Sequence, residues 1–394
     1  LLEVSTTGWL NAVTQGCSSL HAGQGWLFNE SGVTVSFGLV RVANIRTAIT
    51  LARHLSTSLS CDELAVKIAC YHANDFLLSR FNKEHRLDHL LSRGAGNAAI
   101  EADAETRQEV KRASARGCKS LMFIVVATPV EEIGRDHDFD WAVIEPSSAQ
   151  SVVQTAGRVN RHRMQPVAVP NIAVLQFNLK HCKNIENGKD NEAAFIHPGL
   201  ESIGDDGSTH ATHDMTELFV WSETGQLTVD ARLRFDHEVS RFSAFDDTSM
   251  TCSLNKFFGC QIGSIRSMFD NENFAAQLIG QTVYDASPLR SKGNWNQVFF
   301  FTKLEGLAPV FLERLLDGNN VITLIPRSPS ERDRNDWLVS SFEDMLSMCA
   351  ELDVSPMQGT SLVISRYSQA TNSNMEVVLD ESYGAYRITH RAGG

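Results

Sequence analysis

Residues 123–136, FIVVATPVEEIGRD, join an unbroken apolar run to a polar turn, and this stretch decides the fold class. The apolar part, 123–127, has the length and composition of a strand that is buried on both faces, as in a parallel sheet. The turn that follows offers the hydroxyl of Thr128, the backbone freedom of Gly134 and the carboxylate of Asp136. Because ligands bind at the carboxyl ends of parallel strands, the turn is a candidate binding site.

The same kind of apolar run recurs on both sides of this stretch and alternates with helical patterns. Strands are predicted at 33–40, 65–71, 139–144 and 171–177, and helices at 45–59, 79–91 and 104–116. Such alternation predicts a parallel sheet with helices on both faces. The predicted fold class is therefore α/β.

The character of the sequence changes after Phe177, where Asn, Lys, Gly, Asp and His become frequent. Residues 178–290 are interpreted as an insertion and linker helices, following a first domain at 1–177. Residues 291–394 are interpreted as a smaller mixed α+β domain. Its predicted elements are strands at 298–301, 321–325 and 361–365, a helix at 337–352 and a hairpin at 375–389.

Composition narrows the class of protein. The formal charge of −12 argues against a surface that is basic throughout, although it allows a narrow basic channel. No apolar run approaches the ~18 residues that a membrane span needs. The eight cysteines contain no CxxC pair, which disfavours a zinc ribbon and favours reduced cytoplasmic thiols. The first residues, LLEVS, lack a start methionine and a basic front, and this predicts a fragment of a longer polypeptide.

Residues 154–161, QTAGRVNR, carry the second candidate site. A cap at Ser147 or Ser148 predicts a helix here, and steps of four and three residues then place Gln154, Arg158 and Arg161 on one face, left open by Gly157. The planar guanidinium group matches phosphate oxygens. The alternative is a solvated helix face.

Together the two stretches resemble motifs V and VI of superfamily 2 helicases. The runs GRDHDFDW at 134–141 and QTAGRVNRHR at 154–163 resemble the type I-F branch of the CRISPR-associated helicase-nucleases. The resemblance implies a second RecA-like lobe followed by a C-terminal domain. It also implies an ATP-dependent single-strand DNA translocase, fused to an HD nuclease, that degrades foreign DNA. The implied partners are single-stranded DNA, a crRNA-guided surveillance complex and the CRISPR adaptation integrase.

The resemblance also implies roles for individual residues. Arg158 and Arg161 would reach the γ-phosphate of ATP held by a partner lobe, and Gln154 would orient the nucleotide or the attacking water. Further residues would line the nucleotide or the nucleic acid: Gly134, Asp136 and Gly157 on the nucleotide side, and Thr128, His72, Ser79 and Arg80 on the nucleic-acid backbone. A solvated loop is the alternative for the segment from His72 to Arg80. ATP and Mg would be held mainly by the absent first lobe, and a divalent metal by the absent nuclease.

Other signals have an ordinary structural interpretation. No GxxxxGK[ST] loop occurs, so the segment alone is expected to be inactive as an ATPase. The stretch VVLDE at 377–381 has the sequence of a Walker B strand, but it falls in the predicted hairpin. The dipeptide His137-Asp138 is interpreted as part of a loop and not as a nuclease metal site. Trp295, Trp337 and Tyr386 are stacking candidates, with burial in a core as the alternative. Two alternatives stay open. The segment could be a lobe of another superfamily 2 DNA or RNA helicase, or a degenerate lobe that only binds partners.

Overall fold

The computed structural model describes most of the chain, with gaps mainly beyond residue 201. The described residues are 4–29, 31–132, 134–196, 198–201, 209–219, 229, 241–258, 296–305, 308–314, 322–326, 335–365 and 375–387.

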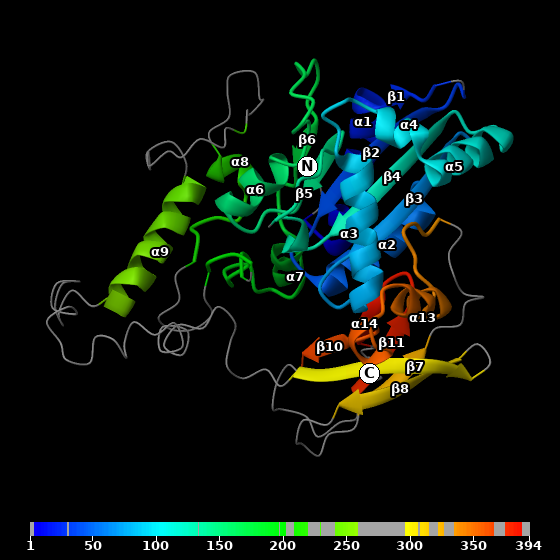
Figure 1. The fold of residues 1–394 in the computed structure, drawn as a ribbon. Coiled ribbons are helices and arrows are strands. Elements are labelled where there is room, and N and C mark those ends of the chain that lie inside the picture. The colour runs from blue at the N-terminus through cyan, green and yellow to red at the C-terminus, as the bar shows by residue number, and fades with distance from the viewer. Residues whose placement is uncertain are drawn as a thin grey trace, which may run out of the picture.

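A mostly parallel sheet organises the first half of the chain (Figure 1). Its strand order is β3-β4-β2-β5-β6, and all of these neighbours are parallel. The short β1 (Trp26–Leu27) adds an antiparallel pairing to β2. The bounds of the five parallel strands are β2 Thr34–Arg41, β3 Leu64–Tyr71, β4 Ser120–Ala127, β5 Trp141–Ile144 and β6 Ile172–Val174.

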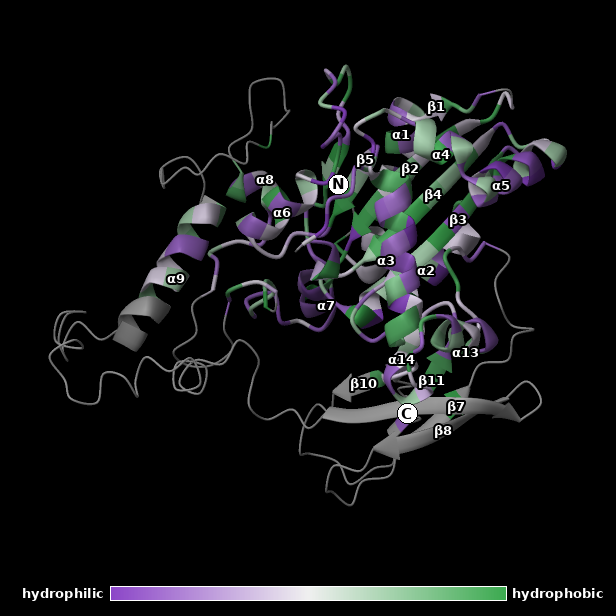
Figure 2. Ribbon diagram, viewed as in Figure 1, coloured by the Kyte–Doolittle hydropathy of each residue, from purple (hydrophilic) through white to green (hydrophobic). Residues whose placement is uncertain are grey.

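Helices cover both faces of the sheet, and the alternation of side chains along each strand determines which core a residue joins. In β4, Phe123 and Val125 pack with α3 (Leu77–Leu91), α4 (Ala98–Ala102), α5 (Ala104–Ala115) and α6 (Ala149–Ala156). Ile124 and Val126 pack on the other face with α1 (Thr6–Gln24), α2 (Ile45–Ser58) and α7 (Leu179–Glu186). In Figure 2 the central strands are green, whereas α3 and α5 carry purple polar residues. The predicted α/β class, with a parallel sheet flanked by helices, is confirmed.

Gly38 in β2 gives the sheet room for a large side chain. A Cβ atom at this position would lie 2.1 Å from the ring of Trp141 in the neighbouring strand. The indole is fully buried and donates a hydrogen bond from Nε1 to Ser36 Oγ at 2.9 Å. The glycine therefore allows a tryptophan in the strand that leads to α6.

The C-terminal part contains two small sheets. One has the order β10-β7-β8, with β7 Asn296–Glu305, β8 Ala308–Arg314 and β10 Leu362–Ser365, all antiparallel. The other has the order β12-β11-β9, with β9 Ile322–Pro326, β11 Met375–Asp380 and β12 Gly384–Arg387. Further helices in the described part of the chain are α8 (Met215–Leu218), α9 (Arg241–Phe258), α13 (Phe342–Glu351) and α14 (Pro356–Gly359). The predicted hairpin is confirmed, and Asp380 accepts hydrogen bonds from the backbone N–H groups of its turn at Ser382 and Tyr383.

Part of this C-terminal region packs into the first sheet. Ile68 of β3 exchanges backbone hydrogen bonds with Asn335 and Trp337, so residues 335–337 extend the edge of the sheet. The Trp337 ring lies 5.0 Å from the ring of Phe123, between centroids, and is buried. The predicted helix start at Trp337 is therefore wrong, because pairing with β3 holds this residue extended and α13 begins at Phe342. The domain boundaries at 177 and 290 stay predictions.

Candidate nucleotide and nucleic-acid site

The turn after β4 has the shape that its sequence predicted. Thr128 follows the last residue of β4, a 3-10 turn at Pro129–Glu131 comes next, and Gly134 has a φ of +69°. A Cβ at Gly134 would meet no atom within 4 Å, so the backbone conformation, and not crowding, is what favours glycine. The turn lies at the carboxyl edge of the sheet, as expected.

The second stretch departs from its prediction. Helix α6 ends at Ala156, and the chain turns so that Phe139 N–H donates to Arg158 O at 2.8 Å and Asn160 N–H donates to Phe139 O at 3.0 Å. Asn160 has a φ of 52°, outside the helical region. The prediction that Gln154, Arg158 and Arg161 share one helical face is therefore wrong, because pairing with a strand-like residue 20 positions upstream replaces the helix. Gln154 alone is helical, and it is half-buried.

The two arginines have different environments. Arg158 is buried, and its guanidinium group donates to the backbone oxygens of Glu131 at 3.2 Å and Glu132 at 2.6 Å. Arg161 keeps 41% of its side chain exposed and donates from Nε to Asp136 Oδ1 at 2.5 Å. Arg158 thus fastens the turn after β4, whereas Arg161 is the guanidinium group that can reach an external anion.

Asp136 connects the two predicted motifs. Its carboxylate is 73% exposed and receives hydrogen bonds from Arg161 and from His162 Nε2, the latter at 3.1 Å. The bonds from His162 and Arg161 hold the pKa of Asp136 below its usual value. An exposed carboxylate paired with an exposed arginine can exchange that partner for a ligand with modest loss of energy.

A buried ion cluster beneath the turn was not predicted. Arg41, at the carboxyl end of β2, donates to Glu132 Oε1 at 2.5 Å and to Glu145 O at 2.9 Å. Burial raises the pKa of Glu132, and the charge of Arg41 opposes that shift. Burial also raises the pKa of Glu145, although N–H groups of Ala43 and Leu179 bond to its carboxylate. The sequence signal that identifies such residues is a charge directly after an apolar strand, as in VR at 40–41 and IE at 144–145.

The His137-Asp138 dipeptide lies in a loop, as interpreted from sequence. His137 is held between Glu131, at 2.6 Å, and Asp88, at 2.9 Å. Burial alone would lower the pKa of His137, but the two carboxylates, Glu131 foremost, raise it overall. Within the ranges that the structure describes, no group of three or more His, Cys, Asp or Glu side chains is arranged to hold a metal ion.

The four predicted nucleic-acid contacts are not equally accessible. His72 and Ser79 are buried, and His72 Nε2 bonds to Tyr383 O at 2.9 Å beneath the C-terminal hairpin. Thr128 is also buried, at the end of β4. Arg80 is half-buried and lies 3.7 Å from Glu84 in the next turn of α3. Of the four side chains, only that of Arg80 offers a charged group near the surface. His72 is buried because the C-terminal hairpin covers it.

The stacking candidates also differ. Trp337 lies in the core, so the alternative considered for it is correct. Tyr386 is half-buried, and its ring takes the guanidinium group of Arg53 at 4.6 Å from the centroid. Trp295 lies outside the described residues. Gly157 adopts a φ of −67° at the end of α6, a conformation open to other residues.

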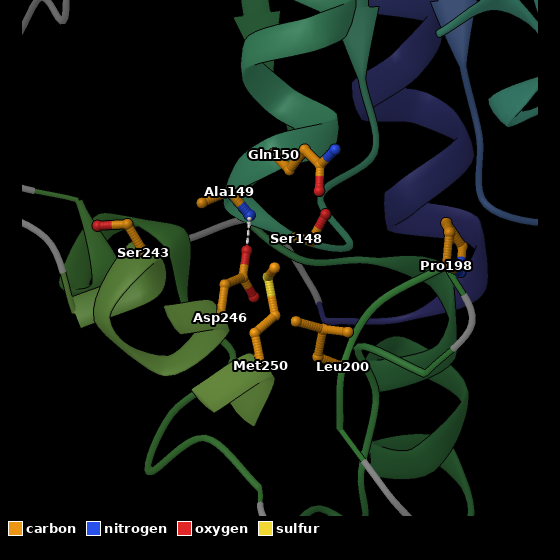
Figure 3. A pocket seen from close by; sticks show the side chains of 8 residues that line it. All are labelled: Ser148, Ala149, Gln150, Pro198, Leu200, Ser243, Asp246 and Met250. Atoms are coloured by element: carbon orange, nitrogen blue, oxygen red, sulfur yellow. Dashed lines mark hydrogen bonds between the residues drawn. The ribbon is translucent and has the colours of Figure 1, made fainter. Parts of the chain in front are cut away.

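A pocket of about 220 Å³ lies at the opposite end of α6 (Figure 3). Asp246 of α9 points toward the start of α6 and accepts a hydrogen bond from Ala149 N–H at 2.8 Å, with Met250 and Leu200 beside it. Burial raises the pKa of Asp246 to about 6 against the opposing effect of these helix N–H groups. A side chain of the protein thus already occupies the anion-binding end of this helix.

Known proteins similar to this chain include nuclease-helicases. Residues 34–164 match the family model described as CRISPR-associated nuclease/helicase Cas3, C-terminal. The chain is 39% identical over 192 residues to the subtype I-F/YPEST Cas3 of Pectobacterium atrosepticum, and 37% identical over 188 residues to that of Pseudomonas aeruginosa. Each match covers 48% of this chain and 17% of the relative, so the chain spans about a sixth of either relative.

Solved structures give a more distant similarity. The crystal structure of T. fusca Cas3 matches with 12% identity and a TM-score of 0.41, covering 96% of this chain and 38% of that one. The T. fusca Cas3-ATP structure matches with 17% identity and a TM-score of 0.29, covering 42% and 16%. The described residues include no helix long and apolar enough to cross a membrane. The family model and the two curated relatives show that the chain carries a Cas3-like C-terminal domain at residues 34–164 and is similar to part of the type I-F Cas3 nuclease/helicases.

Proposed function

We propose that this chain is the second RecA-like lobe and C-terminal domain of an ATP-dependent single-strand DNA translocase. In the full-length protein it works with a first lobe and an HD nuclease to degrade foreign DNA in CRISPR interference. The similarity to the type I-F nuclease/helicases supports this proposal over another superfamily 2 helicase. The partners proposed with this function are single-stranded DNA, a crRNA-guided surveillance complex and, as an additional one, the adaptation integrase.

The pairing of Arg161 with Asp136 carries the proposal for the site. Both side chains are exposed at the carboxyl edge of the parallel sheet, where they can meet a nucleotide held on another lobe. Arg161 is the arginine finger that stabilises charge on the transferred phosphoryl group, and Asp136 holds it when no nucleotide is bound. Arg158 fastens the turn after β4, and Gln154 contributes to orienting the nucleotide or water. ATP and Mg are bound mainly by the first lobe.

The DNA track in this proposal runs past Arg80 on α3. Among the residues that the structure describes, its guanidinium group pairs with the Glu84 carboxylate alone, at 3.7 Å. Phosphate contacts from such groups position the strand without reading its sequence, as a translocase requires. The proposal assigns no direct phosphate contact to His72 or Ser79, because both are buried.

The test is Arg161→Ala in the full-length protein, with ATP hydrolysis and DNA degradation as readouts. We expect about a 10³-fold loss of ATP turnover, the usual effect of removing an arginine finger, with the fold unchanged by circular dichroism. Arg112→Ala is a matched control, because Arg112 is also exposed and also pairs with one carboxylate at 2.5 Å, on α5. Turnover by Arg161→Ala equal to that of Arg112→Ala would refute the finger assignment.

A second measurement separates this proposal from a partner-binding lobe. The chain alone is expected to show no helicase-like ATP hydrolysis, whereas adding the first lobe in trans should restore hydrolysis that depends on Arg161. A lobe that only binds partners would leave hydrolysis by the first lobe unchanged.

A further inference from the structure

The turn that carries Arg161 is built around a buried carboxylate. Asp138 accepts hydrogen bonds from three successive backbone N–H groups: Arg161 at 3.1 Å to Oδ1, His162 at 3.1 Å to Oδ2 and Arg163 at 3.2 Å to Oδ2. Successive N–H groups that converge in this way form an anion-binding concavity. Here the anion is a side chain of the protein, and it is fully buried.

Two arginines complete the surroundings of Asp138. Arg163 donates to both carboxylate oxygens, from Nε at 3.0 Å and from NH2 at 2.8 Å. Arg93 donates to the Asp138 backbone oxygen at 3.1 Å and pairs with Asp140 at 2.8 Å. Burial alone would raise the pKa of Asp138, but the hydrogen bonds and charge of Arg163, with the charge of Arg93, hold it below its usual value. Asp138 is therefore a stable anion at neutral pH.

The backbone of the turn needs such a partner. Asn160 and Met164, the residues on either side of it, have φ values of 52° and 45°, which non-glycine residues adopt at a cost. Asn160 braces the turn from one side by donating from Nδ2 to Gln165 O at 2.6 Å. Asp138 holds the other side, where the N–H groups of residues 161–163 point inward. The base of the Arg161 side chain is fixed in consequence, while its guanidinium end stays free to leave Asp136.

We propose that Asp138 is the positioning residue for Arg161, acting through the backbone of residues 161–163 and touching no nucleotide itself. This inference rests on the proposed function, since it assigns Arg161 the role of finger. It gives the second residue of the His-Asp pair a part in phosphoryl transfer, in place of the metal binding that the dipeptide suggests. The geometry requires ionised Asp138, because an anion is the group that three N–H donors and a guanidinium group together select.

The test is Asp138→Asn in the full-length protein. Whichever way the asparagine amide is oriented, its NH2 group replaces an oxygen that accepts from at least two donors, so donors face donors. The turn then shifts, and a displacement of ~1 Å at a catalytic group can cost on the order of 10²-fold in rate. We expect kcat for ATP to fall roughly tenfold or more with KM little changed, because a finger acts mainly in the transition state.

Asp140→Asn is the matched control for general loss of stability. Asp140 is also buried, and its carboxylate pairs with Arg163, as that of Asp138 does, and in addition with Arg93. It accepts from Phe37 N–H and from no backbone N–H of residues 161–163. The Asp140→Asn variant should therefore lose about as much stability as Asp138→Asn and yet retain most of its ATP turnover. A double variant completes the comparison. Adding Asp138→Asn to Arg161→Ala should cause no further loss of turnover, because the two residues act through one group.

Amide hydrogen exchange at residues 161–163 reports on the turn without depending on catalysis. Asp138→Asn should raise exchange there well above the level in Asp140→Asn. Unchanged exchange, or an equal loss of kcat in both variants, overturns the positioning role. A different result would refute the proposed function: ATP hydrolysis that stays intact in Arg161→Ala. In that case Asp138→Asn, with faster exchange and normal kcat, would also refute the catalytic part of this inference.

Discussion

Lys83 provides a sharp test of how the C-terminal region is joined to the first sheet. Its ammonium group is buried and donates to Asp75 Oδ2 at 2.6 Å, to Cys70 O at 3.0 Å and to Ser382 O at 3.4 Å. Cys70 lies near the end of β3, and Ser382 lies in the hairpin turn more than 300 residues later. One side chain thus bonds to both regions.

The expected cost of Lys83→Met follows from this burial. Methionine replaces the aliphatic stem and removes the ammonium group. The Asp75 carboxylate then keeps a hydrogen bond from Phe76 N–H at 2.9 Å but loses its cation. Both members of the pair are only 1% exposed. Breaking a buried ion pair by removing one partner costs about 3–5 kcal/mol, because the other charge stays uncompensated. We expect the free energy of unfolding to fall by that amount.

Urea-induced unfolding of the chain, followed by circular dichroism, measures the effect. Lys119→Met is the matched control, because Lys119 pairs with Glu63 at 2.5 Å while 74% and 68% of the two side chains are exposed. Such an exposed pair contributes little to stability, because water and salt screen it. Adding Asp75→Asn to Lys83→Met should recover part of the loss by removing the unpaired charge. Equal costs for Lys83→Met and Lys119→Met would show that the hairpin does not enclose Lys83.

Two further predictions concern other contacts of the fold. Trp337→Ala should lower the free energy of unfolding by about 3–5 kcal/mol, because the ring loses its packing against the sheet. Leu352→Ala, at an exposed position, is the control and should cost about 0.5 kcal/mol or less. Urea unfolding measures both. Asp246 has a raised pKa of about 6, so its contribution to docking of α9 is fully present below pH ~4 and is lost as pH rises through 6. Proteolytic cleavage of α9 should therefore increase from pH 5 to pH 7.5 in the natural protein and stay level in Asp246→Asn; a similar increase in both would contradict this assignment.

The sheet was predictable from sequence because its information is local. The apolar run at 121–127 has the composition of a doubly buried strand, and the turn residues Thr128 and Gly134 follow it directly. The end of α6 was not predictable in the same way. Helical spacing continues through Arg161, but backbone pairing between Phe139 and Val159 overrides it, and that pairing depends on residues 20 positions apart. The burial of His72 depends on a hairpin more than 300 residues away.

The unpredicted pairing changes what the two arginines can do. On a helix, Arg158 and Arg161 would present equivalent groups to a nucleotide. In the observed turn, Arg158 bonds to the backbone of Glu131 and Glu132, while Arg161 bonds to a carboxylate only a few residues further along the same loop. The turn after β4 and the turn after α6 are therefore joined by buried contacts of Arg158 and Asp138 and by exposed contacts at Asp136. A nucleotide that draws Arg161 away from Asp136 breaks one exposed contact and leaves the buried contacts intact, so the finger can move while the two motifs keep their relative position.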